Sequence, residues 1–538
     1  MRKKIFLAAF TFFIILAAHA QNGAVDINSS YKPVLRNAVK INIDGTQLPA
    51  DTARPVREYL VPAQNLFYSY APISLKPLAL EQDMNLYLGD RKFLKFGFGN
   101  FATPYAGGGI SLGDGKQGLV NITGDYIHSK GHIVNQDYSL FNAKIAGSYF
   151  LPKNELYGGL ELNAHNYFLY GYDHAVYHFS KDSIRQQFQN ITLRAGFKNT
   201  ASTGTGINYD PNLTVSVFAN RNKASETDAV ITVPAEKNIN DRFSAKAELK
   251  ADITRYALKN TTPGISFSNN IVQATASVTY HDDMIKLHAG VTPAWDNNSY
   301  VLLPDIYGEA QVKDKNFAVQ AGWTGRLIKN SYKNLAALNP YLAPLTGQLN
   351  TKETEYYGGI KASLAKHFNF SAKAGLVQYK NLPFFINDTA TDNKSFVISN
   401  EKSVNDLRIH GDISYINQDK FSFTAGVTFN GYTSMKTNAR AWNTLPVEAT
   451  GSLRWWVFKR VLIKSDLYLF DGSNYLLNGN KAVAFSGGTD LSAGVEIKIN
   501  QHFSAWADAN NILNDKYQRW HNYQVYGANF LGGILLNF

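Results

Sequence analysis

The sequence predicts an all-β protein, a transmembrane antiparallel β-barrel of about 22 strands, and three observations lead to that fold class. Residues 526–538 alternate between an apolar and a mixed face and end on an aromatic residue. The same period of two recurs along the chain, which is typical of strands with one side in lipid. The chain also begins with an export signal and contains no later apolar run long enough for a helical span. The alternative for any single segment is a buried strand of a soluble sheet.

The first twenty residues match a secretory signal peptide. Three basic residues are followed by an uncharged apolar run over residues 5–18 and by the small-x-small pattern Ala18-His19-Ala20. This pattern predicts cleavage between Ala20 and Gln21. The apolar run is too short to span a bilayer comfortably, so we expect export across the inner membrane.

Composition excludes several classes of function. The chain has no cysteine, which rules out disulfides and thiol chemistry. The formal charge of +11 becomes +8 once the three basic residues of the signal are removed. These charges do not form basic runs, so we interpret them as loop and lumen charges and expect no nucleic-acid partner.

Residues 21–91 differ from the rest of the chain. They contain six of the 17 prolines, which are Pro33, Pro49, Pro55, Pro62, Pro72 and Pro77. Proline removes a ladder donor, so no long strand is expected here. We predict an extended periplasmic or lumen-entering arm without a full plug domain; a disordered linker is the alternative. The barrel is expected to occupy residues 92–538.

Several segments predict strands with one apolar and one charged or polar face. In residues 242–257 the apolar side chains alternate with lysine, glutamate and aspartate, and residues 407–415, 420–432 and 490–500 repeat the pattern. The polar faces identify candidate lumen-lining residues: Lys246, Glu248, Lys250, Asp252, Arg408, Asp412, Glu496, Lys498 and Asp508. They could line a water-filled pore, or they could be paired charges that brace a wide lumen. Their mixed signs argue against strong ion selectivity.

Connection lengths give an independent indication. Tight turns such as 314–315, 366–367, 417–419 and 500–501 alternate with long connections such as 328–353 and 382–403. This predicts short periplasmic turns and long extracellular loops. The alternation weakens at residues 201–211, which are long where a tight turn is expected. Without the weaker patterns at 105–113 and 227–235, the count would be 20 strands.

Other side chains suggest weaker hypotheses. The aromatic group near the end of the chain predicts anchoring at the membrane interface, with an external ligand surface as the alternative: Tyr517, Trp520, His521, Tyr523 and Tyr526. Asp173, His174 and His178 are too few for a metal site, and Asp388 and Asp392 lack a bidentate glutamate for calcium. No nucleophile elbow or zinc-protease signature is present, so we expect no enzyme, metal or cofactor.

The final strands resemble those of a known family. Asn511-Ile512-Leu513-Asn514, followed by an aromatic and glycine series that ends at Phe538, is similar to the closing strands of TonB-dependent receptors, especially those of Bacteroidetes-type bacteria. Residues 94–100, Thr103-Pro104 and Tyr31-Lys32-Pro33 resemble a plug-lacking relative. The resemblance covers most of residues 31–538. It implies that the terminal residues are read by the barrel-assembly machinery as an insertion signal: Phe538, Leu536, Ile534 and Phe530.

The resemblance and the charged strand faces together imply a function class. We expect a monomeric barrel in the lipid of a Gram-negative outer membrane, for the passage or uptake of solutes. The alternative is a non-transporting anchor, or a subunit of a periplasmic or surface complex. In that case residues 21–91 would dock a periplasmic or surface-lipoprotein partner.

Overall fold

The computed structural model describes residues 92–538 except 114, 202, 313–315, 365–366, 418–419 and 478–480. The expected signal peptide, its cleavage point at Ala20 and Gln21, and the proline-rich arm of residues 21–91 lie outside the described residues. The expected turn at 314–315 and parts of those at 366–367 and 417–419 do so as well. No helix in the described part of the chain is long and apolar enough to cross a membrane.

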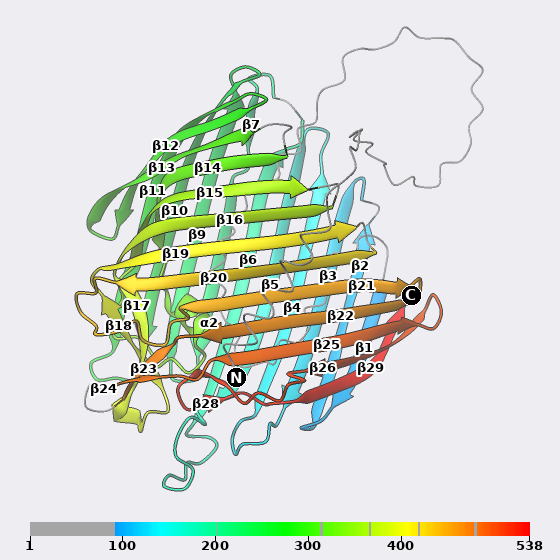
Figure 1. Ribbon diagram of the computed structural model, residues 1–538, viewed down its shortest axis with the longest axis vertical. Helices are drawn as coiled ribbons and strands as arrows, with labels where there is room; N and C mark the ends of the chain where they lie inside the picture. The colour runs from blue at the N-terminus through cyan, green and yellow to red at the C-terminus, as the bar shows by residue number, and fades with distance from the viewer. Residues whose placement is uncertain are drawn as a thin grey trace. The chain divides into compact units, whose positions relative to one another are not determined.

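The described chain forms a closed antiparallel ring of 22 strands, which confirms the predicted fold class (Figure 1). The ring strands follow one another in chain order: β1 (Lys92–Gly99), β2 (Thr103–Gly113), β3 (Gly118–Ser129), β4 (Tyr138–Phe150), β5 (Asn154–Phe168), β6 (Arg185–Asn199), β8 (Asn212–Asn220), β9 (Ala224–Asn238), β10 (Phe243–Leu258), β11 (Ile265–His281), β12 (Ile285–Asp296), β13 (Ser299–Val312), β14 (Phe317–Ile328), β15 (Thr351–Leu364), β16 (Phe368–Lys380), β19 (Val404–Asn417), β20 (Phe421–Thr433), β21 (Val447–Phe458), β22 (Val461–Asp471), β25 (Gly488–Lys498), β26 (Phe503–Asn510) and β29 (Asn529–Asn537).

One ring position contains two strands in succession. The short strand β7 (Ile207–Tyr209) pairs with β9 at residues 235–237, next to the part of β9 that pairs with β8. Pro211 separates the two strands, and its missing N–H interrupts the ladder. The sheet therefore has 23 strands but the ring has 22, and the long stretch at 201–211 is partly a strand. Both weaker patterns form full strands, β2 and β9, so the alternative of 20 is wrong.

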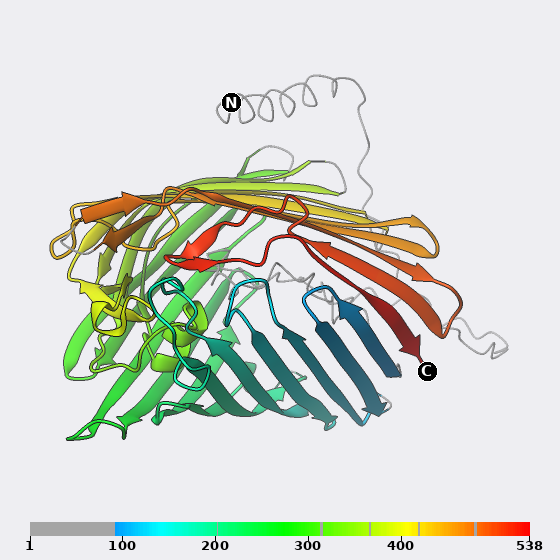
Figure 2. The ribbon, with the colours of Figure 1, turned by 90° about the horizontal axis from the view of Figure 1, so that it is seen from below.

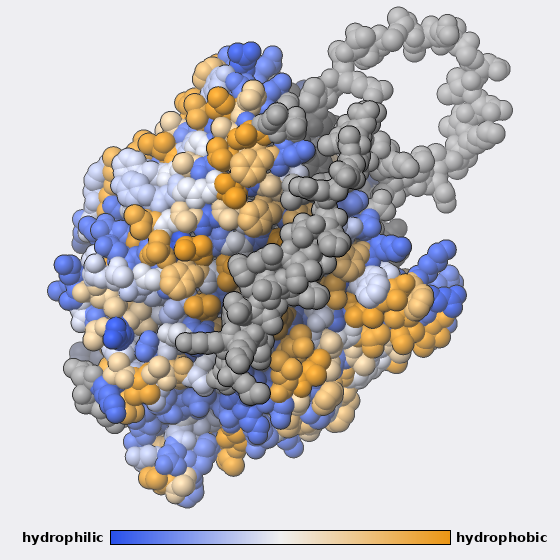
Figure 3. Space-filling view, in the orientation of Figure 1, coloured by the Kyte–Doolittle hydropathy of each residue, from blue (hydrophilic) through white to orange (hydrophobic). Residues whose placement is uncertain are grey.

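Side chains alternate between the two faces of the wall as the sequence predicts. On β10 the outer-face residues Leu249 and Ile253 are 62% and 45% exposed. Thr254, which directly follows Ile253 and faces the other side, is buried. On β29, Phe530 and Ile534 are exposed and Leu535 is buried. Figure 3 shows hydrophobic side chains spread over the wall and the strongest hydrophilic colour at strand ends. This distribution matches an outer face in lipid and a polar inner face.

The ring closes where β1 pairs with β29, from Phe93 opposite Asn537 to Gly99 opposite Leu531. The ladder continues past both strands, because the backbone N–H of Phe538 donates to Lys92 O at 2.8 Å. The backbones approach closely here: a Cβ added at Gly533 would lie 1.8 Å from the carbonyl oxygen of Phe96. Glycine at this position is therefore a requirement of closure.

The two ends of the ring have different connections. At the end where β1 begins, successive ring strands are separated by few residues, except for residues 200–211 between β6 and β8; we call this the turn end. At the opposite end, the loop end, long connections carry the remaining elements: α2 (Tyr332–Leu338), β17 (Leu382–Asn387), η2 (Thr389–Thr391), β18 (Phe396–Glu401), β23 (Asn474–Leu477), β24 (Lys481–Ala484), β27 (Gln518–Trp520) and β28 (Tyr523–Gln524).

The predicted alternation of short and long connections is not strict. Three connections at the loop end are tight turns, at residues 100–102, 221–223 and 297–298. Each contains a residue in the left-handed region, with φ of 56° at Phe101, 59° at Lys223 and 53° at Asn297. Such residues allow a tight turn between two strands, so a long loop is not needed there.

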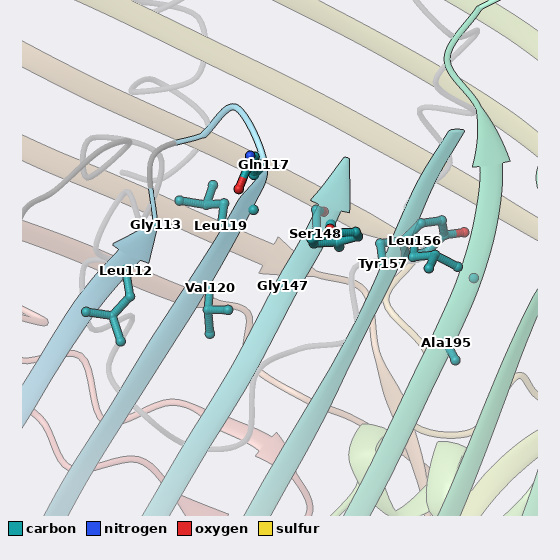
Figure 4. Close-up of a pocket in the computed structure, with 13 residues that line it drawn as sticks. Leu112, Gly113, Gln117, Leu119, Val120, Gly147, Ser148, Leu156, Tyr157 and Ala195 are labelled. Carbon is teal, nitrogen blue, oxygen red and sulfur yellow. The ribbon is translucent and has the colours of Figure 1, made fainter. Parts of the chain in front are cut away.

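A shallow apolar groove of about 680 Å³ lies near the turn end of β2–β6 (Figure 4). Its lining includes the exposed side chains Leu112, Val120, Tyr149 and Leu156 and contains no charged residue. Register places these four side chains on the outer face of the wall. The groove thus includes exposed apolar side chains of the outer face.

We predict that Gly533→Ala will weaken ring closure. The added Cβ must displace the β1 backbone, and overpacking of this kind costs about 1–3 kcal/mol. The expected result is a lower temperature for the conversion of the folded, fast-migrating band to the unfolded band on electrophoresis. Gly358→Ala on β15 is the control, because its Cβ would have no atom closer than 4.0 Å. Equal shifts in the two variants would contradict the prediction.

Candidate functional site: a polar lumen with an inward-folded lid

Three long connections at the loop end fold into the lumen. They are residues 329–350, 381–403 and 511–528, and we call them together the lid. Figure 2 shows the green α2 segment and the red hairpin β27–β28 between the orange and the cyan walls. Because these connections start on different sides of the ring, their meeting narrows the loop end of the lumen.

An aromatic core joins the lid to the inner wall. The wall contributes inward-facing residues near the loop ends of β3–β10, the connection between β5 and β6 contributes Tyr170, and the lid contributes residues from all three connections. The buried members are Ile127, Tyr138, Leu140, Tyr167, Tyr170, Phe188, Phe218, Ala224, Tyr256, Leu258, Tyr332, Leu335, Ala336, Tyr341, Leu342, Leu345, Phe385, Phe396, Trp520, Tyr523 and Tyr526. Burial of this much aromatic surface favours the inward position of the lid over a hydrated, extended one.

Polar contacts attach the first lid connection to the wall. Lys329 Nζ donates to Asp252 Oδ1 at 2.6 Å, and both residues are largely buried. The carboxylate of Glu226 on β9 accepts from the backbone N–H of Tyr332 at 2.6 Å and of Lys333 at 3.2 Å. Charge-assisted bonds of this kind are stronger than neutral ones, so they fix where the helix α2 begins.

The aromatic group near the end of the chain was expected at the membrane interface, and that expectation is wrong. Trp520, Tyr523 and Tyr526 are only 0–2% exposed and belong to the core of the lid. Tyr517 is buried against Phe470. The reason is that residues 511–528 turn into the lumen instead of remaining beside the outer face, so these rings meet protein rather than lipid.

His521 links the lid to the next loop. Its ring stacks on Tyr475 of β23 with centroids 3.7 Å apart and an angle of 18° between the planes. Burial lowers the pKa of His521 to about 4, so the imidazole is neutral at physiological pH. A neutral ring can be buried in this stack without the desolvation cost of a charge.

Glu401 organises the outer part of the lid. Its side chain is fully buried and accepts hydrogen bonds from the backbone of the loop between β20 and β21: Lys436 N at 2.7 Å, Thr437 N at 2.9 Å and Asn438 N at 2.7 Å. Burial acts to raise the pKa of Glu401, but the N–H donors of Asn438 and Lys436 outweigh it and hold the pKa below its usual range. The carboxylate is therefore ionised at neutral pH.

The structure places the candidate lumen residues of β10 on its inner face. Lys246 Nζ lies 2.9 Å from Glu248 Oε2, so these two form an ion pair. Asp252 binds Lys329 of the lid. Lys250 lies between them in the strand, on the same face. This row thus runs from a partly exposed ion pair near the turn end to an attachment point of the lid.

Arg408 on β19 belongs to a separate charged network. Its guanidinium lies 3.4 Å from Glu353 Oε1 and 3.8 Å from Asp406 Oδ2, and it donates to the hydroxyl of Tyr379. Arg326 Nη2 binds the other oxygen of Glu353 at 2.9 Å. These charges pair across the strands β14, β15 and β19, which braces the wall.

The remaining candidates lie elsewhere on the inner face. Asp412 accepts from Ser371 Oγ, and Glu496 Oε2 lies 3.8 Å from Lys464 Nζ. Lys498 Nζ lies 4.3 Å from the ring centroid of Trp456. Asp508 is on β26, the neighbour of β25. The nine candidates are therefore spread over β10, β19, β25 and β26 and do not converge on one site.

The two weak metal candidates do not gain ligands. His174 Nε2 contacts the carbonyl oxygen of Tyr170 at 3.1 Å, and Asp388 caps η2 by accepting from the N–H of Ala390. Among the residues that the structure describes, no group of three His, Asp or Glu side chains is placed to hold a metal ion.

Three sets of important residues could not be identified from strand periodicity. The lid attachment through Glu226 and Lys329, the Tyr341 ring and the Glu353 network all depend on contacts between distant segments. A usable signal was present in the loops themselves. The connection at 329–350 carries tyrosines and leucines, for example Tyr332, Leu335 and Tyr341, that an exposed loop would not need.

No family model and no curated protein matches the sequence. Solved structures do match in fold. The FrpB iron transporter of Neisseria meningitidis has a TM-score of 0.65 at 10% identity, over 83% of this chain and 81% of that one. The copper transporter OprC has a TM-score of 0.61 at 12% identity, over 84% and 80%. The ferripyoverdine receptor of the outer membrane of Pseudomonas aeruginosa has a TM-score of 0.61 at 10% identity, over 83% and 72%.

The TM-scores establish a shared fold, while the sequence identities are low. The chain has the barrel architecture of outer-membrane receptors and transporters, in agreement with the ring geometry described above.

We predict that Glu401→Gln will loosen the segment at residues 434–438. Replacing the ionised acceptor removes charged hydrogen bonds worth about 1.5–3 kcal/mol, so proteolytic cleavage of this segment should become roughly tenfold faster or more. Glu309→Gln, which breaks a half-exposed ion pair with Lys361, is the control. Cleavage at wild-type rate in Glu401→Gln would contradict the role of the carboxylate.

We further predict the pH dependence of this segment. A depressed carboxyl pKa adds stability above the ordinary glutamate pKa of about 4.3, and that stability is lost as pH falls through the folded-state pKa. Cleavage of the wild-type segment by an acid protease should therefore accelerate only below about pH 4. Glu401→Gln should lack this step. A step of the same size in both proteins would show that another group is responsible.

Proposed function

We propose that this chain is an outer-membrane barrel for the passage or uptake of solutes. The observation that carries the proposal is the closed ring with exposed apolar side chains outside and hydrogen-bonded charges inside. A wall of this kind separates a wet lumen from lipid. The barrel is expected to act as a monomer without enzymatic chemistry.

The comparisons support this class of function. The fold neighbours include proteins described as an iron transporter, a copper transporter and a siderophore receptor. The resemblance of residues 511–538 to the closing strands of TonB-dependent receptors points the same way. A ring of 22 strands is also wide enough that its lumen must be filled or narrowed by protein to avoid leakage, and the lid does so at the loop end.

The remaining features complete the proposal. Residues 1–20 would direct export and be removed between Ala20 and Gln21, and residues 21–91 would form an arm in place of a full plug. Phe538, Ile534 and Phe530 face outward at the closing strand, a position accessible to assembly machinery; Leu536 lies on the same face.

The charges in the lumen suggest weak ion selectivity. Lysine or arginine is paired with aspartate or glutamate in the inner wall, as in Lys246–Glu248, Lys464–Glu496 and Arg408–Glu353. Neighbouring charges of opposite sign largely cancel each other at the distance of a passing ion. We therefore propose that polar solutes are discriminated by size and fit more than by net charge.

The test is a cysteine placed on each face of one strand. We predict that Lys250→Cys, on the inner face of β10, will respond to a negatively charged thiol reagent in planar bilayers. Leu249→Cys, the adjacent outer-face position, will not. One charge about 7 Å from a passing ion in water changes its energy by about 0.6 kcal/mol, so permeability should change roughly threefold. The absence of cysteine in the native chain makes both labels specific.

Two outcomes would contradict the proposal. Equal changes in permeability after labelling of Lys250→Cys and of Leu249→Cys would show that the current does not pass through the lumen. No current from the wild type, from either cysteine variant or from the lid variants described below would exclude passage and favour the role of a membrane anchor for a complex.

A further inference from the structure

The hairpin at residues 517–526, which includes β27 and β28, contacts loop connections from many positions around the ring. Its side chains and carbonyl groups meet six other connections, between β3 and β4, β5 and β6, β14 and β15, β16 and β19, β20 and β21, and β22 and β25. We call it the closing hairpin. We infer that it is a releasable strap that holds the loop end of the lumen shut. This inference rests on the proposed function, because closing the lumen matters only if solutes pass through it.

Contacts on one side of the closing hairpin reach across the mouth. The Tyr523 ring stacks on Tyr341 with centroids 3.5 Å apart, and Tyr170 packs against it edge-on at 4.9 Å. The carbonyl oxygen of Gln524 accepts from both Gln136 Nε2 and Tyr170 Oη at 2.8 Å. Tyr341 comes from the connection after β14, whereas the hairpin follows β26. Tyr523 therefore joins segments from well-separated positions on the ring.

Contacts on the other side join the neighbouring loops. Trp520 packs edge-on against Phe385 and Phe396, with centroids 5.0 and 5.6 Å away. Arg519 Nη1 donates to the carbonyl oxygen of Asn443 at 2.9 Å. Because these loops are held through the same hairpin, its withdrawal would release them together.

The closing hairpin can move without opening the barrel wall. Its two short strands pair only with each other, through Gln518–Gln524 and an irregular Trp520–Tyr523 pair, and form a sheet separate from the ring. Its attachment to other parts of the protein consists of side-chain packing and single hydrogen bonds. Movement of the strap would therefore break aromatic contacts while every ladder bond of the ring remains. The closed position is favoured by the buried aromatic contacts, so opening requires that these contacts be replaced or weakened.

The aromatic surface indicates how release is coupled to a solute. Tyr170, Tyr341 and Tyr523 have their rings together and are buried, and the hydroxyls of Tyr170 and Tyr523 donate to the carbonyl oxygens of Gln524 and Lys394. When the closing hairpin is displaced, these rings and hydroxyls are uncovered, and a polar or aromatic solute can occupy the partners that the hairpin held. Binding would then favour the open lid by its differential affinity for that state.

The experiment measures access to the lumen, independently of transport. A single cysteine at Lys250 is labelled in intact cells by a bulky maleimide that does not cross membranes. Tyr523→Ala and Trp520→Ala should each raise the labelling rate at least tenfold while the heat-modifiable folded band persists. Tyr177→Ala is the matched control, because Tyr177 is an exposed loop tyrosine outside the lid core. Its labelling rate should equal that of the parent.

A second arm locks the strap. Gln136→Cys with Gln524→Cys, joined by a short reducible thiol cross-linker, should abolish solute flux into proteoliposomes, and reduction should restore it. The singly substituted proteins treated in the same way are the controls. This arm measures solute flux and not labelling, so the cysteine at position 250 is omitted.

The outcomes separate the inference from the function on which it rests. Unchanged labelling in folded Tyr523→Ala and Trp520→Ala proteins would overturn the strap. Faster labelling with no flux in any variant would keep the strap and reject solute passage. Flux that is indifferent to the cross-link would also overturn the strap, even if the wild type conducts.

Discussion

The structure depends first on the need to satisfy every backbone donor and acceptor at the depth of a bilayer, where no water can replace a missing partner. The ring meets this need only because β29 pairs with β1. At that seam Gly97 and Gly533 lie opposite each other, and the Trp506 ring occupies the space that a side chain at Gly97 would need. A small number of glycines at this seam thus allows β1 and β29 to pair, and this pairing closes the ring formed with the remaining 20 strands.

Closure creates a second problem, because a ring this wide encloses more space than its own side chains can fill. The protein solves it in two ways. Ion pairs such as those of Arg408 with Glu353 and of Lys464 with Glu496 let the inner wall carry charge without leaving it unpaired. At the loop end the lid inserts an aromatic core, so part of the lumen has the packing of a soluble protein interior.

The wall was predictable from the sequence and the lid was not. Strand periodicity is local, so it identified β10, β19 and β25 and the inward direction of Asp252 and Arg408. The same rule failed for Trp520 and Tyr523, because an aromatic residue in a long connection has no period that shows whether it faces lipid or the lumen. Contacts such as Glu226 with α2 join segments over 100 residues apart and follow from the folded ring alone. Asp252 illustrates both cases: its face was predictable, but its partner Lys329 was not.

The position of the closing hairpin has a consequence for assembly. It lies between β26 and β29, and β29 is the strand that closes the ring on β1. Residues 511–528 must therefore span the loop end before β29 can pair with β1. The same stretch of chain carries Trp520 and Tyr523, which join the lid connections. A defect between β26 and β29 would thus affect ring closure and lid closure together.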